Sequence, residues 1–189
     1  MKAAEFQAKG HGKEAAWVDL VNSEEWDTWG RRTDHLEDPS WPAFFLAQWR
    51  FPEPGRAGFP ADRFRALRGV LRRAAQAAYH GRALGERELR ALNEALSVAG
   101  SRRLCHGQNG WRLEFAPETE GWEWILAETA RSFADLLTRD GASRIKVCRN
   151  PGCRWVFYDA TKARTRRWCS DKVCGNRERV RRARARARG

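Results

Sequence analysis

Paired cysteines near the carboxyl end constrain the fold of this chain more than any other feature. Four of the five cysteines lie in the last 42 of 189 residues, as Cys148 with Cys153 and Cys169 with Cys174. Two such pairs of thiolates can close a tetrahedral zinc site. Sulfur would fill all four ligand positions and leave none for a catalytic water. The spacing therefore predicts a structural zinc ion.

The cysteine count also bears on redox chemistry. Five is an odd number, and Met1–Lys13 lacks the apolar central stretch of an export signal. Metal ligation is therefore favoured over disulfide formation. Two alternatives remain: four reduced buried thiols, or a redox switch in which oxidation ejects the metal.

The segment around the cysteines is too short to fold on apolar burial alone. A stretch of about 45 residues buries little core, whereas a structural zinc site contributes about 10–16 kcal/mol of apparent binding free energy. Five residues along one helix would turn Cys174 about 140° from Cys169. We therefore expect Cys169 before a helix and Cys174 in its first turn. With a tight turn at 150–152 and a strand at 155–159, this predicts a treble-clef-like or ribbon-like finger with a basic C-terminal helix.

The net charge of +12 is concentrated in the same segment. Residues 144–189 hold sixteen Lys or Arg against three acids, a balance of +13, whereas residues 1–143 hold twenty against twenty-one, a balance of −1. This segregation predicts a tail that binds nucleic acid, with DNA as the first candidate and folded RNA as the alternative. The last residues, in which Arg and Ala alternate, are expected to be frayed without a polyanion.

Candidate contacts to nucleic acid flank the second cysteine pair. Arg can chelate a phosphate or a guanine edge, and Asn can pair with adenine. The candidates are Lys162, Arg164, Arg166, Arg167, Asn176, Arg177, Arg179, Arg181 and Arg182.

The first 143 residues show mainly helical periodicity. Helices are expected at 41–51, 61–80, 87–98 and 119–140. The third of these carries a stripe of Leu89, Leu92 and Leu96. A loop at Arg31–Pro42 and a β-hairpin at 102–117 complete the pattern. The expected fold is α+β: a mostly helical domain with a small β element at 1–143, followed by the zinc finger at 144–189.

Polar and reactive residues of the first domain form no recognisable catalytic signature. The sequence has no Gly-rich phosphate loop, nucleophile elbow or HExxH motif, so enzymatic activity is not expected. Cys105 and His106 are adjacent, but neighbours in a strand point to opposite faces. Asp19 and Asn22 lie three residues apart in a short predicted helix or strand. They form either a polar effector site or a cap or buried hydrogen bond.

Tryptophans crowd the first fifty residues. They can pack as core, or they can line a pocket for an apolar small-molecule effector. These residues are Trp17, Trp26, Trp29, Trp41 and Trp49.

The stretch CRNPGCRWVFYDATKARTRRWCSDKVCGNRERVRR closely resembles the CGNR-type zinc-finger family, whose name motif stands here as Cys174–Arg177. Upstream, WVDLVNS resembles the LDxVNT-like motif that opens the ABATE-type domain of stress-responsive bacterial transcription regulators. Asp19 and Asn22 match that motif, whereas Trp17 and Val18 precede Asp19 and Ser23 replaces Thr. The resemblance implies a bacterial regulator with a DNA-binding zinc finger.

These observations combine into one hypothesis. No apolar run approaches the roughly 18–20 residues of a membrane helix, so we expect a cytoplasmic, nucleoid-associated protein with no membrane partner. The finger would contact DNA while the first domain senses a signal or mediates assembly. A two-fold oligomer would suit a palindromic operator.

Overall fold

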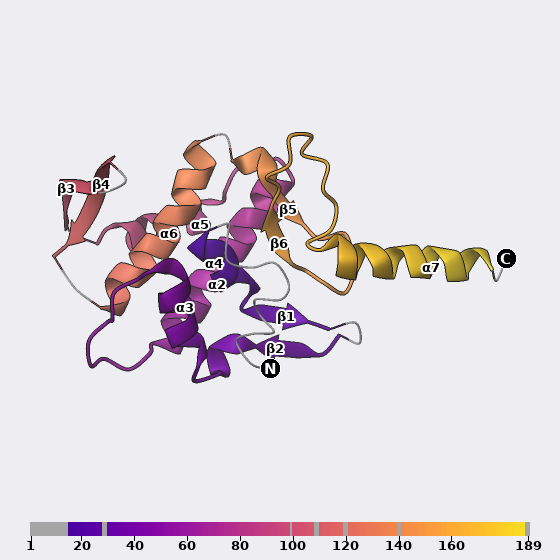
Figure 1. Cartoon of the computed structure of the whole chain (residues 1–189), viewed down its shortest axis with the longest axis horizontal. Coiled ribbons are helices and arrows are strands. Elements are labelled where there is room, and N and C mark those ends of the chain that lie inside the picture. The colour runs from indigo at the N-terminus through magenta and orange to yellow at the C-terminus, as the bar shows by residue number, and fades with distance from the viewer. Residues whose placement is uncertain are drawn as a thin grey trace.

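The computed structural model describes residues 15–27, 30–98, 100–107, 110–118, 121–139 and 141–187. These residues form a helical body with short β-hairpins, from which one helix, α7 (Asn176–Arg186), projects at the C-terminal end (Figure 1). This arrangement confirms the expected α+β class.

The helices of the body form close to where apolar periodicity predicts them. Helices α4 (Ala61–Tyr79), α5 (Glu86–Leu96) and α6 (Trp122–Thr138) match the predicted segments to within three residues at each end. Helix α3 (Trp41–Trp49) begins at the predicted residue, and the first segment is the helix α2 (Ala16–Asn22). Long periodic segments therefore specify their own helices.

The C-terminal segment after Gly175 is more regular than expected. We expected the alternating Arg and Ala residues to be frayed, but α7 continues as a helix to Arg186. Glu178 pairs with Arg181 and Arg182, three and four residues further along, so oppositely charged neighbours support the first turns of this helix.

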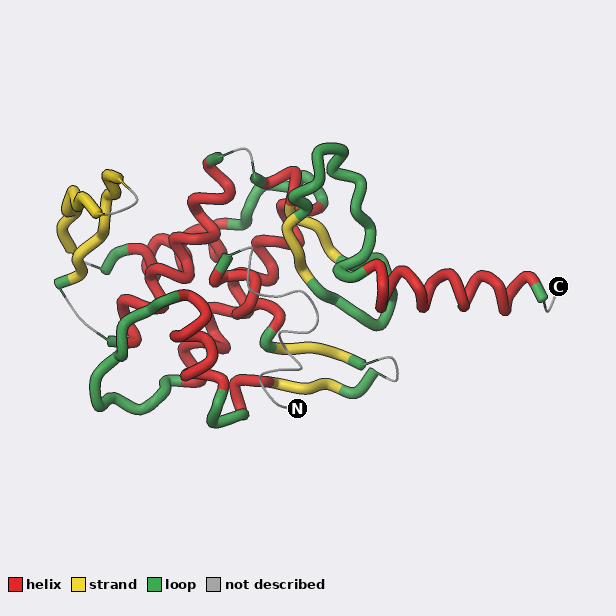
Figure 2. The backbone as a smooth tube through the Cα atoms, viewed as in Figure 1, coloured by secondary structure: helices red, strands yellow, loops and turns green. Residues whose placement is uncertain are grey.

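All strands of the described chain lie in two-stranded antiparallel hairpins, drawn in yellow in Figure 2. The pairs are β1 (Glu24–Trp26) with β2 (Arg32–Asp34), β3 (Gly100–Gly107) with β4 (Gly110–Pro117), and β5 (Ile145–Val147) with β6 (Val156–Tyr158). The second pair confirms the predicted hairpin at 102–117.

The first hairpin corrects the expected loop at Arg31–Pro42. Part of that segment is β2, followed by a 3-10 turn at His35–Glu37. A strand of three residues is too short to show a period-two pattern. The hairpin turn depends instead on the Asp27 carboxylate, which accepts a hydrogen bond from the Arg31 amide at 2.9 Å, and on Gly30, whose φ is +80°.

The core lies among α2, α3, α4 and α6 and is strongly aromatic. Trp17, Phe45, Phe64 and Phe133 are fully buried, and the Trp17 and Phe133 rings meet edge to face at 5.0 Å. The predicted stripe on α5 is partly wrong, since Leu89 is 47% exposed. Helix α5 lies at the edge of the body, so only one of the three predicted leucines, Leu92, is buried.

A buried ion pair fixes the first hairpin to α4. Arg68 donates to both carboxylate oxygens of Asp34, at 2.6 and 2.8 Å, and to the Ser23 hydroxyl at 3.0 Å. Burial tends to raise the pKa of Asp34, but the hydrogen bonds and charge of Arg68 outweigh that effect and lower the pKa to about 2. The carboxylate is therefore ionised at any physiological pH.

Among the described helices, none is both long enough and apolar enough to cross a bilayer.

Candidate metal centre and nucleic-acid interface

The four C-terminal cysteines meet at one point. Their sulfur atoms all lie within 4.8 Å of one another, and Cys169 Sγ is 3.6 Å from Cys153 Sγ and 3.7 Å from Cys174 Sγ. A zinc ion with four Zn–S bonds of about 2.3 Å places its sulfur ligands about 3.8 Å apart. The donor set and its spacing therefore fit tetrahedral zinc, with Cys148 as the fourth ligand.

The electrostatics of the cluster also favour a cation. Hydrogen bonds from the neighbouring sulfurs lower the pKa of Cys148, while contacts with Cys148 raise the pKa of Cys153 and Cys169. Four adjacent thiolates repel one another, so a dication among them is needed to hold all four ionised. With sulfur in every position, zinc would supply structural cross-linking.

A hairpin tip positions the first cysteine pair. Cys148 follows β5, and its amide donates to the Trp155 carbonyl at 2.8 Å. Asn150 begins the tight turn, where its backbone carbonyl accepts from the Cys153 amide at 2.9 Å and its side chain accepts from the Gly152 amide at 3.3 Å. The turn points both sulfurs inward, as the sequence predicts for 150–152.

A single wide helical turn positions the second pair. Cys169 precedes this turn, Asp171–Gly175, and Cys174 lies within it, where its amide donates to the Ser170 carbonyl at 2.9 Å. A Cβ at position 175 would meet the exposed Asp171 carboxylate and lie 3.1 Å from the Trp168 ring, so a larger residue there would require both side chains to shift. The turn leads directly into α7, so the metal centre fixes the base of the projecting helix.

Aromatic residues cover the cluster. Trp155 and Phe157 are buried against the cysteines, and Trp168 packs beside them. Arg166 lies over the Phe157 ring at 4.6 Å and donates to the carbonyl oxygens of Trp168, at 2.9 Å, and Cys169. This arginine therefore holds the loop that carries the third ligand, although the sequence suggested it as a nucleic-acid contact.

The basic residues of α7 divide between two sides of the helix. Asn176, Arg177, Arg181 and Arg184 line one shallow face around Val180, whose exposed fraction is 42%. On the other side, Arg182 pairs with Glu178 at 2.8 Å and Arg179 pairs with Asp171 at 3.1 Å. Arg181 lies between the two sides, because it also pairs with Glu178. Hydrogen bonds from Arg181 and Arg182 lower the pKa of Glu178 to about 2.

The remaining predicted contacts lie in the loop before the third ligand. Lys162 and Arg167 are exposed, and Arg164 donates to the Ser143 hydroxyl at 3.0 Å. Lys146 and Arg149, which the sequence did not single out, lie beside this loop. They fall in a strand and a turn, where their charge alone distinguishes them.

The two motif residues of α2 have different buried partners. Asn22 donates from Nδ2 to the Val156 carbonyl at 2.7 Å and accepts from the Val156 amide at 3.0 Å. Its side chain thereby pairs with an edge of β6 as a neighbouring strand would. Asp19 accepts from Trp49 Nε1 at 2.9 Å. Asn22 therefore connects the body to the hairpin that carries the first cysteine pair.

A half-buried arginine adds a second connection between body and finger. Arg72 of α4 donates to the carbonyl oxygens of Val21, at 2.5 Å, and Glu24, at 3.1 Å, and reaches that of Arg154 at 3.4 Å. Its guanidinium lies over the Trp26 ring at 5.2 Å. Burial lowers the pKa of Arg72 to about 10, so it stays charged at neutral pH.

The junction continues into the hydrophobic core. Ile145 of β5 and Val156 of β6 are each 1% exposed and belong to the core of the body. The hairpin of the finger is therefore packed as part of the body, and the metal-bound loops extend from it.

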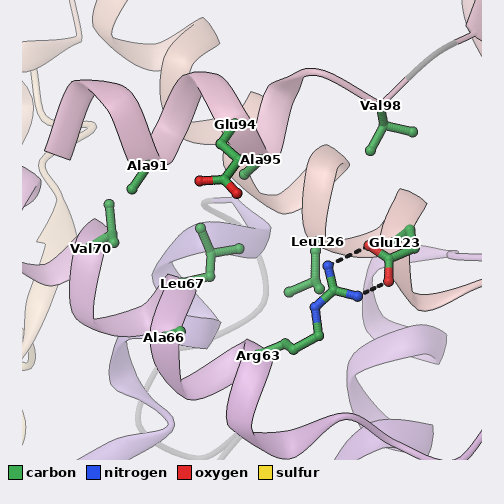
Figure 3. A pocket seen from close by; sticks show the side chains of 10 residues that line it. All are labelled: Arg63, Ala66, Leu67, Val70, Ala91, Glu94, Ala95, Val98, Glu123 and Leu126. Atoms are coloured by element: carbon green, nitrogen blue, oxygen red, sulfur yellow. Dashed lines mark hydrogen bonds and ion pairs between the residues drawn. The ribbon is translucent and has the colours of Figure 1, made fainter. Parts of the chain in front are cut away.

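A groove with an apolar floor lies between α4, α5 and α6 (Figure 3). Its volume is about 260 Å³, and an ion pair between Arg63 and Glu123 lies at its edge. The side chains on its floor are Ala66, Leu67, Val70, Ala91, Ala95 and Leu126. Glu94 lies at its rim, exposed, and no ion pair to it is found among the described residues.

The tryptophans of the first fifty residues have different environments in the structure. Trp17 and Trp41 are core residues, Trp26 contacts Arg72 and Arg154, and Trp49 contacts Asp19. The fifth, Trp29, lies outside the described residues. The four described tryptophans do not line the groove of Figure 3.

Cys105 and His106 are successive residues of β3, as predicted. Their partners across the hairpin are the separate positions Arg112 and Trp111. Cys105 is half-buried and His106 is exposed.

A four-cysteine metal centre that anchors an Arg-rich helix, with its hairpin packed against a helical body, defines a zinc-finger protein with an additional N-terminal region. Family models agree with this class. Residues 14–140 match the ABATE family, described as "Putative stress-induced transcription regulator", and residues 144–187 match the CGNR zinc finger. The chain belongs to the ABATE family and ends in a CGNR zinc finger, as the sequence motifs predicted.

These are regulator and zinc-finger families rather than enzyme families. The comparison with curated proteins found no match to this chain.

Proposed function

We propose that this protein is a DNA-binding transcription regulator whose helix α7 enters the major groove. The observation that carries the proposal is the projection of an Arg-rich helix from a metal-fixed base (Figure 1). Eleven residues give a helix about 16 Å long, and the major groove of B-DNA is wide enough to admit a helix.

The face around Val180 supports a reading role. Arg177 and Arg184 have no intramolecular partner within the described chain, so their guanidinium groups are available to a guanine edge or a phosphate. Asn176 begins the same face, where its amide can pair with adenine, and the exposed Val180 offers methyl groups to thymine. Arg179 and Arg182 are held by carboxylates and would contact the flanking phosphates.

In vitro selection tests this proposal. Zinc-loaded full-length protein is mixed with a random duplex DNA library and with a structured RNA library at the same salt concentration, and the bound molecules are sequenced. A shared motif enriched in DNA supports the proposal. Enrichment of RNA alone would replace DNA by RNA as the partner, and enrichment of neither would refute nucleic-acid binding.

In this proposal the N-terminal domain senses a signal. The groove of Figure 3 offers an apolar floor for the body of a small molecule, and Glu94 at its rim favours a cationic group on that ligand. Helix α4 contributes Leu67 and Val70 to this groove and Arg72 to the finger, so one helix joins the two sites.

Amphipathic amines are the probes that test this sensing site. The filled-groove variant Ala95→Trp should lose any rise in melting temperature that such an amine causes in the wild-type protein. A rise that persists in the variant would place the ligand elsewhere. In this proposal the protein acts in the cytoplasm, bound to the nucleoid.

A further inference from the structure

A second basic surface lies on the finger, apart from α7. It is a cleft of about 230 Å³ between the end of α4, strand β5 and the loop that precedes the third zinc ligand. Tyr79 of α4 forms one wall. Its cationic lining residues are Lys146, Arg149, Arg164, Arg166 and Arg167, and no carboxylate is among the described residues that line it.

Backbone hydrogen bonds and the metal centre build this cleft. The Arg149 amide donates to the Arg167 carbonyl at 3.0 Å, which joins the turn after Cys148 to the loop before Cys169. The same loop is held by Arg166, whose guanidinium is committed to two backbone carbonyls. Arg164, Arg166 and Arg167 are thus placed by a loop whose two ends are zinc ligands, whereas Lys146 lies in β5 and Arg149 in the turn after Cys148.

Asp159, the acidic residue between the two cysteine pairs, offsets only part of the charge of the cleft. Asp159 is fully buried, and its carboxylate accepts hydrogen bonds from the Thr161 amide, the Thr161 hydroxyl and the Arg166 amide. Burial tends to raise its pKa, but these hydrogen bonds, with a smaller contribution from the charge of Lys146, outweigh that effect and lower the pKa. Its carboxylate is therefore hydrogen-bonded inside the loop, and among the cleft cations it acts electrostatically on Lys146.

The end of α4 cannot account for so much positive charge. A helix C-terminus is equivalent to about half a negative charge, which one cation already satisfies. Lys146, Arg149 and Arg167 have no ion-pair partner within the described chain. Arg164 meets only a neutral hydroxyl, and its φ of +53° lies in the left-handed region where glycine or asparagine would cost less. Like charges gathered in this way repel one another until an anion binds between them.

We propose that this cleft binds backbone phosphates of the nucleic acid whose groove α7 enters. Arg and Lys side chains are the usual donors to phosphate, and such contacts fix register without reading sequence. Because the cleft and α7 are attached to the same metal centre, the finger would hold its target at two places. This inference rests on the proposed function.

The salt dependence of binding tests the cleft directly. The cleft variant is Lys146→Gln with Arg149→Gln and Arg167→Gln. The matched control is Arg56→Gln with Arg87→Gln and Arg90→Gln, which removes the same charge from exposed positions of the body. Affinity for a 20-base-pair duplex is measured by fluorescence anisotropy between 50 and 300 mM salt.

Three lost phosphate contacts should reduce the slope of log affinity against log salt by about 2.7, at about 0.9 for each contact. The control variant should keep the wild-type slope. Since Arg149 is next to a zinc ligand, zinc content is checked in every variant, and the single variants Lys146→Gln and Arg167→Gln should each reduce the slope by about 0.9.

The outcomes separate this inference from the proposed function. An unchanged slope in the cleft variant, with a reduced slope in an α7 variant, overturns the cleft and leaves the proposed function standing. A wild-type protein that binds neither duplex DNA nor structured RNA overturns both. An equal loss in the cleft and control variants would assign the effect to net charge and overturn the cleft.

Discussion

Replacing Asn22 should loosen the finger from the body. Its side chain is 1% exposed and makes two hydrogen bonds with the backbone of Val156, at 2.7 and 3.0 Å. In the variant Asn22→Ala, the amide and the carbonyl of Val156 both lose their partner while the valine stays in the core. Leaving a buried polar group unpaired costs about 1–3 kcal/mol, so the two together should cost about 2–6 kcal/mol.

For a chain of this length, 1 kcal/mol corresponds to about 2–4 °C in melting temperature, so a loss near 3 kcal/mol should lower it by about 6–12 °C. Differential scanning calorimetry of zinc-loaded protein measures this shift. The exposed Asn93→Ala, on α5, is the matched control and should change the melting temperature by less than about 2 °C.

The near-isosteric variant Asn22→Asp should make the stability loss depend on pH. The carboxylate still accepts from the Val156 amide but faces the Val156 carbonyl with an oxygen instead of a donor. Protonation restores the donor, so the pKa of the new carboxyl should be raised by folding. The deficit relative to wild type should then shrink as pH falls from 7 to 5. A deficit independent of pH, or an Asn22→Ala melting temperature within 2 °C of wild type, would refute this role for Asn22.

Three further perturbations have expected outcomes. The pKa of Asp34 falls from 3.8 to about 2 on folding, so its ion pair stabilises the folded state fully above about pH 4. As pH falls to 2, the folded state should lose about 2 kcal/mol of this stabilisation. In an acid titration of unfolding, the variant Asp34→Asn should not show this loss of about 2 kcal/mol. Cys153→Ser should abolish binding of one zinc per chain and increase hydrogen exchange at 148–175. The helices of the body should stay folded, with a lowered melting temperature. A body that unfolds together with the finger would refute the division of the chain into two domains. Arg72→Met should weaken zinc retention against a chelator, because the Arg154 carbonyl loses a donor; retention equal to wild type would remove this residue from the junction.

The sequence predicts the metal centre well because its signal is local. Thiol spacing, the turn at 150–152 and the rotation argument for Cys174 together place all four sulfurs, and the structure brings them within 4.8 Å. The long amphipathic helices of the body are predictable for the same reason, since a repeated pattern over many residues outweighs any single position.

Contacts between distant segments were not predictable in this way. Asn22 and Val156 are 134 residues apart, and no periodicity links them. Arg68 lies beside Leu67 on the buried side of α4. A charged residue next to an apolar stripe was the only feature of the sequence that could have predicted a buried ion-pair partner for Arg68. The roles of the individual basic residues were not predictable either. Arg166 donates hydrogen bonds to backbone carbonyls, whereas Lys146 and Arg149 line a cleft.

Binding of duplex DNA by α7 is the most direct test of this account. The affinity of zinc-loaded wild-type protein for a selected duplex is compared with that of Arg177→Gln combined with Arg184→Gln, two changes on the exposed face of the helix. We expect a loss of at least tenfold at physiological salt, with zinc content and melting temperature unchanged, since each contact to a base edge contributes about 1–3 kcal/mol. An affinity equal to that of the wild type would contradict the claim that this helix reads DNA.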